Sequence, residues 1–330
     1  MRLANAAGLF AGFGLDAVIG DPARLHPVAG YGHWAAAVER RSYAPTRPAG
    51  LRHTAIAVGV PVAAAGVAVL ATRRRPLARA LLVAAATWAV LGGNSLRREA
   101  SAMADRLTAG DLVAARDQLP NLCGRDPAGL TGPELARATV ESVAENSSDA
   151  EVAPLVWGAL AGLPGLIGYR AVNTLDAMVG HRNERYRRFG TASARLDDLA
   201  NLVPSRLTAL LTVLVAPAVG GRRGRALRIW LRDGHRHPSP NAGQCEAAMA
   251  GALGRRLGGK NIYFGQVEAR SELGDGPVPD ADDVRRAASV SRLVGLSALA
   301  LCLGHVLAGG LRTALLQSLR ARRRTRRRGA

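Results

Sequence analysis

The sequence predicts an all-α, polytopic integral membrane protein with about four to six transmembrane or re-entrant helices joined by polar helical loops. Hydrophobic residues make up 48% of the chain although aromatic residues make up only 4%, and long uncharged runs such as 54–71 carry much of this content. The 44 basic residues outnumber the 25 acidic ones, and arginine fills the segments between the runs. Basic loops beside apolar runs are typical of membrane proteins. We expect residues 1–330 to form a single membrane domain.

Four apolar runs are predicted to span the membrane. Segment 3–20 is expected to be a first helix that the mature protein keeps, because no convincing small-residue cleavage site follows it. Runs 54–71 and 80–96 are predicted to form a helical hairpin around the basic turn 73–76. The fourth run, 289–311, is long enough to cross a bilayer. Glycine pairs four residues apart in such helices, as at Gly8 and Gly12, allow close helix contact.

Two further runs, 152–169 and 207–221, are short or broken by proline, and two interpretations stay open for them. They are either transmembrane or re-entrant helices, which need protein or water to cover the broken backbone, or buried helices of a soluble core. The orientation of the chain also stays open. The basic turn 73–75 and the polybasic tail 320–330, which we expect to be disordered, both favour the cytoplasm. Six full spans would then place the long polar loops outside.

Composition narrows the function classes. The net charge of +19 is typical of proteins that bind nucleic acid, membrane surfaces or anionic ligands. No zinc finger, helix-turn-helix or RNA-binding aromatic pattern is present, so we expect a lipid bilayer and no nucleic acid as partner. The three cysteines lack metal-binding spacing and are expected to be reduced. The phosphate-binding loop, the dinucleotide fingerprint and the nucleophile-elbow motif are all absent.

Two short segments in the first half of the chain contain acidic residues that are candidates for a functional site. Asp21 and His26 follow the first helix. Either the two side chains bind a metal or Asp21 orients the His26 imidazole, or they only form the turn that ends the helix. Glu141, Glu145 and Asp149 recur every four residues, so they share one helix face. Three carboxylates on one face repel one another unless a cation binds there. The stripe suits a magnesium–nucleotide site, because Mg²⁺ takes one or two carboxylates with phosphate oxygens, and the alternative is a solvated face.

Three further strings follow the run 152–169. Asn173 and Asp176 come directly after that run, where polar groups are functional by default. Five arginines between positions 182 and 195 precede Asp197 and Asp198, and arginine clusters either bind phosphate or mark a cytoplasmic loop. The stiff turn His-Pro-Ser-Pro-Asn-Ala-Gly at 237–243 starts a helix whose N-terminus either binds an anion or serves as a rigid connector.

Together and in this order, the strings resemble the cobalamin-biosynthesis family called CobD or CbiB, adenosylcobinamide-phosphate synthase. The resemblance covers most of the chain, roughly from Gly20 to Gly265. One departure is Arg125-Asp126-Pro127, where the family typically has Ser-Arg-Asp-Thr, so a role of that threonine hydroxyl is lost. The matching strings are GDP-x₃-HPV, RATVESVAEN, APL-x-WGAL-x-GLPG, YRAVNTLD-x-MVG, RNERY-x₂-FG, ARLDDLANL and HPSPNAG-x₂-EAAMAGAL.

The resemblance implies an enzyme of the cell membrane that uses ATP and Mg²⁺. It would join adenosylcobyric acid through an amide bond to (R)-1-amino-2-propanol or to its O-2-phosphate, of which the resemblance favours the phosphate. A carboxylate must first be activated, as an acyl phosphate, because hydroxide is a poor leaving group. Other late enzymes of cobalamin biosynthesis are expected partners. Two alternatives are a membrane transporter of an anionic or corrinoid ligand, which broken helices and arginine-lined loops suit, and a non-catalytic membrane sensor.

The resemblance places the site on the strings, and the residue chemistry suggests roles within it. Catalytic roles are predicted for Glu141, Glu145, Asp149, Asp176, Asp197 and Asp198, of which Glu145, Asp149 and Asp176 are also the predicted metal ligands. Substrate binding is predicted for Asp21, His26, Arg125, Arg170, Asn173, Arg182, Arg195, His237, Asn241 and Glu246.

Overall fold

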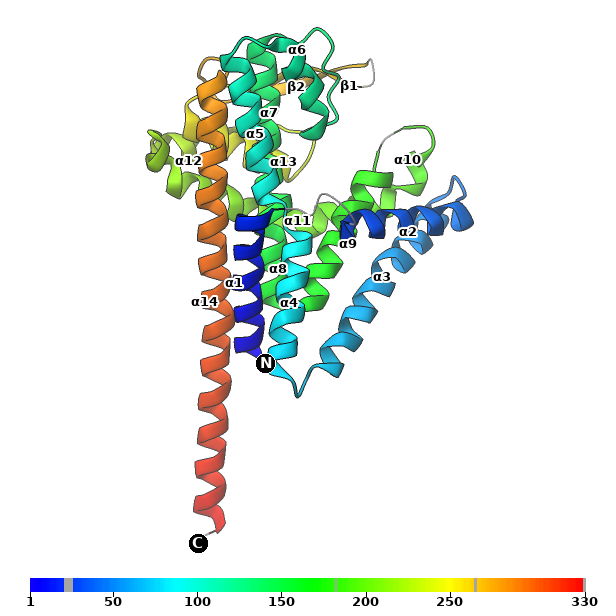
Figure 1. Ribbon diagram of the computed structural model, residues 1–330, viewed down its shortest axis with the longest axis vertical. Coiled ribbons are helices and arrows are strands. Elements are labelled where there is room, and N and C mark those ends of the chain that lie inside the picture. The colour runs from blue at the N-terminus through cyan, green and yellow to red at the C-terminus, as the bar shows by residue number, and fades with distance from the viewer. Residues whose placement is uncertain (21–25, 182, 264–265, 329–330) are drawn as a thin grey trace.

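The computed structural model describes residues 1–20, 26–181, 183–263 and 266–328, and it confirms the all-α prediction (Figure 1). Apart from one two-stranded hairpin, the described elements are helices. We call one group the apolar bundle, and it consists of α1 (Arg2–Ile19), α3 (Arg47–Ala71), α4 (Pro76–Val90), α8 (Ala153–Ala161), α9 (Leu163–Val179) and α14 (Ala281–Arg328).

A second group of elements forms a polar half at the top of Figure 1, and α14 extends into it. It contains α5 (Gly93–Thr108), α6 (Leu112–Gln118), α7 (Gly132–Ser147), α12 (Arg223–Asp233), α13 (Ala242–Leu253) and the antiparallel strands β1 (Leu257–Tyr263) and β2 (Gln266–Leu273). The remaining helices are α2 (Pro27–Ser42), α10 (Tyr186–Phe189) and α11 (Thr191–Val215), with 3₁₀ turns at Leu119–Asn121 and Ala216–Val219 and a π-helical turn at Ser148–Val152.

Five helical segments of the described chain are long and apolar enough to cross a membrane. Four of them cover the runs predicted as spans to within one residue at the ends of those runs, and they correspond to α1, α3, α4 with α5, and α14. The short turn of the predicted hairpin is confirmed, because α3 ends at Ala71 and α4 begins at Pro76, where a proline needs no hydrogen-bond partner. The two helices diverge from this turn instead of packing along each other, since α3 packs mainly on α9 and α4 on α1 (Figure 1). The fifth segment, 191–219, contains the shorter run 207–221 apart from its last two residues. The chain is therefore a multi-pass membrane protein.

The run 152–169 forms two helices rather than one. Gly162 separates α8 from α9 with a φ of 65°, a conformation that favours glycine. The turn lies close to α1, since a Cβ at Gly162 would be 3.1 Å from the amide nitrogen of Asn5. Leu155 of α8 and Leu166 of α9 are fully buried. The two helices therefore form a hairpin that packs into the apolar bundle and presents its tip around Leu160, which is 60% exposed.

Helix α1 packs closely against α4 through its glycine pair. A Cβ on Gly8 would lie 2.6 Å from Cβ of Val83, and a Cβ on Gly12 would collide with Thr87. Helices in lipid approach this closely only through small residues. The sequence-based prediction of a close helix contact at this pair is therefore confirmed.

Replacing Gly12 by leucine is expected to separate α1 from α4 and to lower the melting temperature strongly. The added side chain has no space, and overpacking typically costs about 1–3 kcal/mol. Gly14→Leu is the matched control on the same helix, since nothing lies within 4 Å of a Cβ there. Thermal unfolding of both variants in detergent tests this, and equal melting temperatures would contradict the packing.

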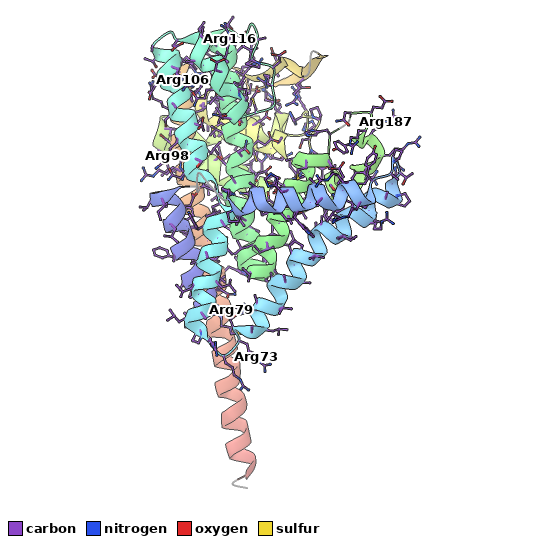
Figure 2. The ribbon with its side chains drawn as sticks, turned by 45° about the vertical axis from the view of Figure 1, so that its right-hand side comes forward. Arg73, Arg79, Arg98, Arg106, Arg116 and Arg187 are labelled. Atoms are coloured by element: carbon purple, nitrogen blue, oxygen red, sulfur yellow. The ribbon has the colours of Figure 1, made fainter. Side chains whose placement is uncertain are left out.

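Helix α14 runs along the whole molecule and packs beside α1 (Figure 1). Its backbone continues as helix as far as Arg328, through the tail for which the sequence suggested disorder. Arginine has high helix propensity, and extending an existing helix avoids the cost of nucleation. Arginine lies at both ends of the helices beside α14, with Arg73 and Arg79 near the turn between α3 and α4 and Arg106 and Arg116 at the upper end of Figure 2.

Candidate active site

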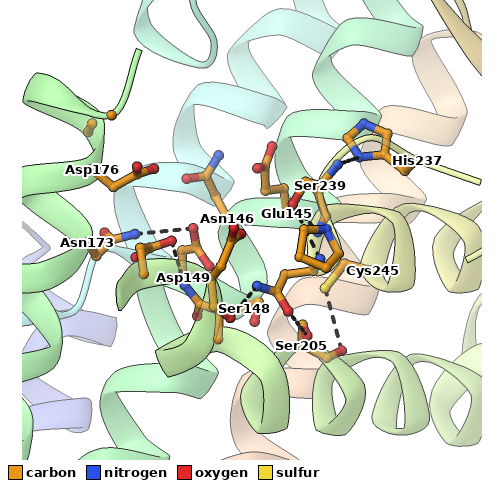
Figure 3. Close-up of a pocket in the computed structure, with 18 of the residues that line it drawn as sticks. Glu145, Asn146, Ser148, Asp149, Asn173, Asp176, Ser205, His237, Ser239 and Cys245 are labelled. Atoms are coloured by element: carbon orange, nitrogen blue, oxygen red, sulfur yellow. Dashed lines mark hydrogen bonds between the residues drawn. The ribbon is translucent and has the colours of Figure 1, made fainter. Parts of the chain in front are cut away.

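A cavity of about 660 Å³ lies where α7, α9, α11, α13 and β2 meet (Figure 3). Segments far apart in the sequence therefore surround one space. Of the predicted site residues, eight line it: Glu145, Asp149, Asn173, Asp176, Asp197, Asp198, His237 and Asn241.

Helix α7 forms the first wall of the cavity. The acidic residues of its predicted stripe have different surroundings. Glu145 is exposed to the cavity, whereas Glu141 is 5% exposed and turned away from it. One oxygen of Glu141 accepts a hydrogen bond from Arg125 at 2.5 Å, and the other accepts the backbone N–H of Gly258 at 2.7 Å. Glu141 and Arg125 thus fasten the base of the β1–β2 hairpin to α7.

The π-helical turn after α7 carries Asp149 into the cavity. Oδ2 of Asp149 accepts a hydrogen bond from the Asn173 amide at 3.2 Å, which joins the turn to α9. The Tyr169 hydroxyl donates to Asn201 at 2.9 Å, and the Asn201 amide donates to Asp197 at 3.0 Å. Single π-helical turns are frequent at functional sites, and this one places Asp149 beside the carboxylates of α11.

The opposite wall carries positive charge. Nε2 of His237 lies 3.2 Å from Nη1 of Arg270, a cavity residue on β2, and 3.7 Å from Oε1 of the buried Glu246. Nδ1 of His237 accepts the backbone N–H of Ser239 at 3.0 Å, which sets the ring orientation. The Ser239 hydroxyl in turn accepts the N–H groups of residues 241 and 242 and so caps α13.

Asn241 joins the start of α13 to α11 and is only 8% exposed. Its carbonyl oxygen accepts a hydrogen bond from Ser205 at 3.1 Å and one from Arg206 at 3.0 Å. Its amide donates to the backbone oxygen of Asp198 at 2.8 Å. All these side-chain groups are engaged with protein, so Asn241 holds the two helices that border the cavity.

The cavity carboxylates are hard to ionise together. Burial raises the pKa of Asp149, and that of the neighbouring buried Glu246, well above their ordinary values, and it also raises the pKa of Glu145. Repulsion from Asp197 raises the pKa of Asp149 further. Arg270 acts in the opposite direction on Glu145 and Glu246. The cavity therefore favours protons or other cations.

Stability of the ligand-free protein is expected to fall as pH rises. A carboxyl with a raised pKa stabilises the folded state only while it is protonated. That contribution is complete below about pH 4, the ordinary carboxyl pKa, and is lost as pH rises through the folded-state values. Melting temperatures in detergent measured from about pH 4 upward test this. The double variant Glu145→Gln, Asp149→Asn should flatten the profile, Glu272→Gln should not, and an unchanged slope in the double variant would contradict it.

A protein-family model described as CobD/Cbib protein matches residues 9–291. The chain belongs to the CobD/CbiB family. A cobalamin biosynthesis protein CobD from Mycobacterium tuberculosis (strain ATCC 25618 / H37Rv) is 52% identical over 300 residues, covering 90% of this chain and 94% of that protein. Proteins of the same name from Geobacter metallireducens and Rhodobacter capsulatus are 46% and 42% identical, covering 89% and 87% of this chain and 93% of each relative. No solved structure matches the chain.

Membership in the CobD/CbiB family places the chain among cobalamin biosynthesis proteins. Several strings that carried the resemblance meet at the cavity, since Glu145, Asn173, Asp197 and His237 come from four of them. Sequence reasoning missed Arg270, which lies on a strand outside the singled-out strings. Other lining residues to which it assigned no role are Cys123, Asn146, Ser148, Asn201, Ser205 and Cys245.

Some predicted substrate-binding residues lie away from the cavity. His26 accepts the N–H of Val28 and begins α2, and Arg195 is exposed on α11. Arg170 donates to the backbone oxygen of Val90 and to Asn173, so it supports the cavity wall from behind. The predictions for Asp21 and Arg182 fall outside the described residues.

The predicted metal ligands Glu145, Asp149 and Asp176 all line the cavity. Within the described part of the chain, however, no three histidine, cysteine or acidic side chains are grouped closely enough to bind one ion. The described residues therefore do not favour a metal ion that is bound by protein ligands alone. An ion shared with a phosphate needs only one or two carboxylates.

Proposed function

We propose that the chain is an ATP- and Mg²⁺-dependent ligase of the cell membrane. It joins adenosylcobyric acid to (R)-1-amino-2-propanol O-2-phosphate, or to aminopropanol, and gives adenosylcobinamide phosphate in the first case. The observation that carries the proposal is the single cavity in which five carboxylates face an arginine, a histidine and the start of a helix. The family resemblance supplies the substrates, and the cavity supplies groups suited to their phosphates and amine.

Phosphate groups are best placed at the positive wall. Arg270 presents a guanidinium, which matches phosphate oxygens through paired hydrogen bonds. His237 stands beside it, and the dipole of α13, whose first residues line the cavity, also favours an anion there. These groups would hold and orient a phosphate while the substrate carboxylate becomes an acyl phosphate.

Asp149 and Asp197 fit a magnesium ion that also binds phosphate. The second oxygen of Asp197, Oδ1, is buried and finds no hydrogen-bond partner among the described residues. Such an oxygen is costly to bury unless a cation approaches it. When bound, Mg²⁺ would neutralise charge on the phosphates. The amides of Asn173 and Asn201 hold the two carboxylates in place.

Amide formation requires an uncharged amine, and Glu145 is the best-placed base. It faces the cavity, and its raised pKa brings it closer to neutral pH, where a base is most effective. The amine nitrogen bonds to the acyl carbon, the bond from that carbon to the phosphate oxygen breaks, and Glu145 takes the proton. Phosphate leaves toward Arg270.

The test is an assay of detergent-solubilised protein with adenosylcobyric acid, aminopropanol phosphate and Mg-ATP. ADP release and an amide product that both depend on all three substrates would support the ligase. Folded protein that gives no product would contradict it. Uptake of labelled corrinoid by vesicles that contain the protein would instead favour the transporter.

Arg270→Gln is expected to raise the KM for a phosphate-bearing substrate by about 10- to 100-fold, the value of a hydrogen bond to a charged group. Arg270→Lys should recover part of the loss, because lysine keeps the charge without the paired donors. Arg256→Gln is the matched control, since Arg256 pairs only with the exposed Glu272 among the described residues. Steady-state kinetics test this, and equal KM values for both variants would exclude Arg270 from phosphate binding.

A further inference from the structure

Helix α11 carries a continuous apolar stripe that no described part of the protein covers. Its members are exposed by 36% to 68%, which is unusual for large apolar side chains on one helix face. At about 100° per residue they fall within an arc of about 60°. They extend over almost the whole helix and are Leu196, Leu199, Val203, Leu210 and Leu214.

The opposite face of α11 borders the cavity. At the same angular spacing, its cavity residues are centred about 180° from the apolar stripe. They are Ala194, Asp197, Asp198, Asn201 and Ser205. One helix therefore separates an apolar surface from the polar cavity. A helix that crossed the bilayer would carry these two aspartates and an asparagine to membrane depth, where such groups are costly.

The direction of α11 also differs from that of the spanning helices, and Figure 1 shows it passing across the bundle. Ser193 hydrogen-bonds to α3 through Thr54 at 2.9 Å. Further along, the backbone oxygen of Ala200 accepts from α8, and Ser205 donates to Asn241 at the start of α13. The turn after α11 contacts α14. A helix that meets four others in succession lies transverse to them.

We propose that α11 lies in the plane of the membrane interface, with its apolar stripe on the lipid acyl chains and its cavity face toward water. The length and composition of α11 satisfy the criteria for a span, but its two-faced pattern is that of an interfacial helix. The bundle exposes apolar side chains of the same kind, since Val18 and Ile19 of α1 are 78% and 55% exposed.

Basic residues border the stripe, as lipid headgroups would require. Arg195 is exposed on α11 beside the apolar arc, Arg187 and Arg188 precede the helix, and Arg222 and Arg223 follow it. Arginine extends its charged end to the headgroups while its stem covers apolar surface. Arg195, which the sequence suggested for substrate phosphate, thereby becomes a headgroup contact. The cavity then opens at the membrane surface, whichever reaction it catalyses.

Depth measurements on single spin labels test this without any activity assay. Nitroxides are placed one at a time at Leu199, Val203, Leu210 and Leu214, and the protein is reconstituted into phosphatidylcholine–phosphatidylglycerol vesicles. Cys245 and Cys302 are 2% and 6% exposed, so only Cys123 is replaced by serine in every variant. Power saturation with oxygen and with a nickel chelate then gives the depth of each label.

An interfacial α11 predicts one shallow depth for all four labels. A spanning α11 predicts depths that differ by about 22 Å between positions 199 and 214, at 1.5 Å per residue. Helix α3 provides the matched control, because labels at Ile56, Val60 and Leu70 lie on its exposed face and should show such a gradient.

Each outcome decides the proposal. Equal shallow depths on α11 beside a gradient on α3 support it, and a gradient on α11 overturns it. Low accessibility to both relaxing agents, with spin–spin broadening between copies, also overturns it in favour of a second copy of the chain on the stripe. Comparing depths along α11 requires only two labels that are far apart on the helix, so the test remains possible if one variant does not fold.

Discussion

Replacing Glu145 by glutamine is expected to abolish amide formation while leaving the protein folded in the membrane. The change preserves the shape of the side chain but removes its ability to take a proton. Loss of a general base typically lowers turnover by about 10²- to 10⁴-fold. Because Glu145 faces the cavity, the variant should keep or slightly raise its melting temperature. Single-turnover formation of the amide measures the effect.

Glu272→Gln is the matched control for this experiment. Glu272 is exposed and pairs with Arg256 across the surface at 3.3 Å, an interaction of little energetic value. Its activity should equal that of the unmodified chain. Normal turnover in Glu145→Gln would remove this residue from the reaction and move the search for the base to Asp176 or Asp198, the other cavity carboxylates without a role so far.

The largest effect on stability is expected from an alanine at Gly93 or Gly295. Both glycines border Glu151, a fully buried carboxylate that pairs with Arg97 at 2.8 Å. A Cβ on Gly93 would collide with Oε1 of Glu151, and one on Gly295 would lie 2.6 Å from Oε2. Glu151 has no room to move, because one glycine lies on α5 and the other on α14.

The cost of either alanine combines two terms. Overpacking costs about 1–3 kcal/mol, and displacing Glu151 from Arg97 adds the roughly 3–5 kcal/mol of a broken buried ion pair. Gly304→Ala, where nothing lies within 4 Å of the new Cβ on the same helix α14, is the matched control. The folded fraction after detergent extraction and the melting temperature measure the loss. A Gly295→Ala protein as stable as Gly304→Ala would refute the close fit.

Local patterns in the sequence predicted much of the architecture and part of the site. Apolar length alone located α1, α3, α4 and α14, since a bilayer imposes that length. A spacing of four residues correctly placed Glu145 and Asp149 on one side of α7 and its continuation. The same spacing could not separate Glu145 from Glu141, because a small rotation along the helix brings Glu141 to Arg125 instead of to the cavity.

Contacts between residues that are far apart in the sequence could not be predicted from local patterns. Arg270 reaches the cavity only because the hairpin folds back over α7 and α13, and no spacing rule connects it with Glu145. Arg185 of the arginine-rich segment pairs with Glu39 of α2 at 2.8 Å, although the two residues are 146 positions apart in the sequence. The transverse direction of α11 is likewise set by its neighbours, since its apolar content equals that of a spanning helix.

The contact between α1 and α14 has a consequence for biosynthesis. Helix α1 leaves the ribosome before α14, one of its packing partners, which is made from residue 281 onward. At roughly 5–20 residues per second, the interval is tens of seconds. Arg270, the last residue of the cavity, also emerges late. During this interval α1 lies in the membrane without α14 beside it, so the bundle closes only after α14 has been made.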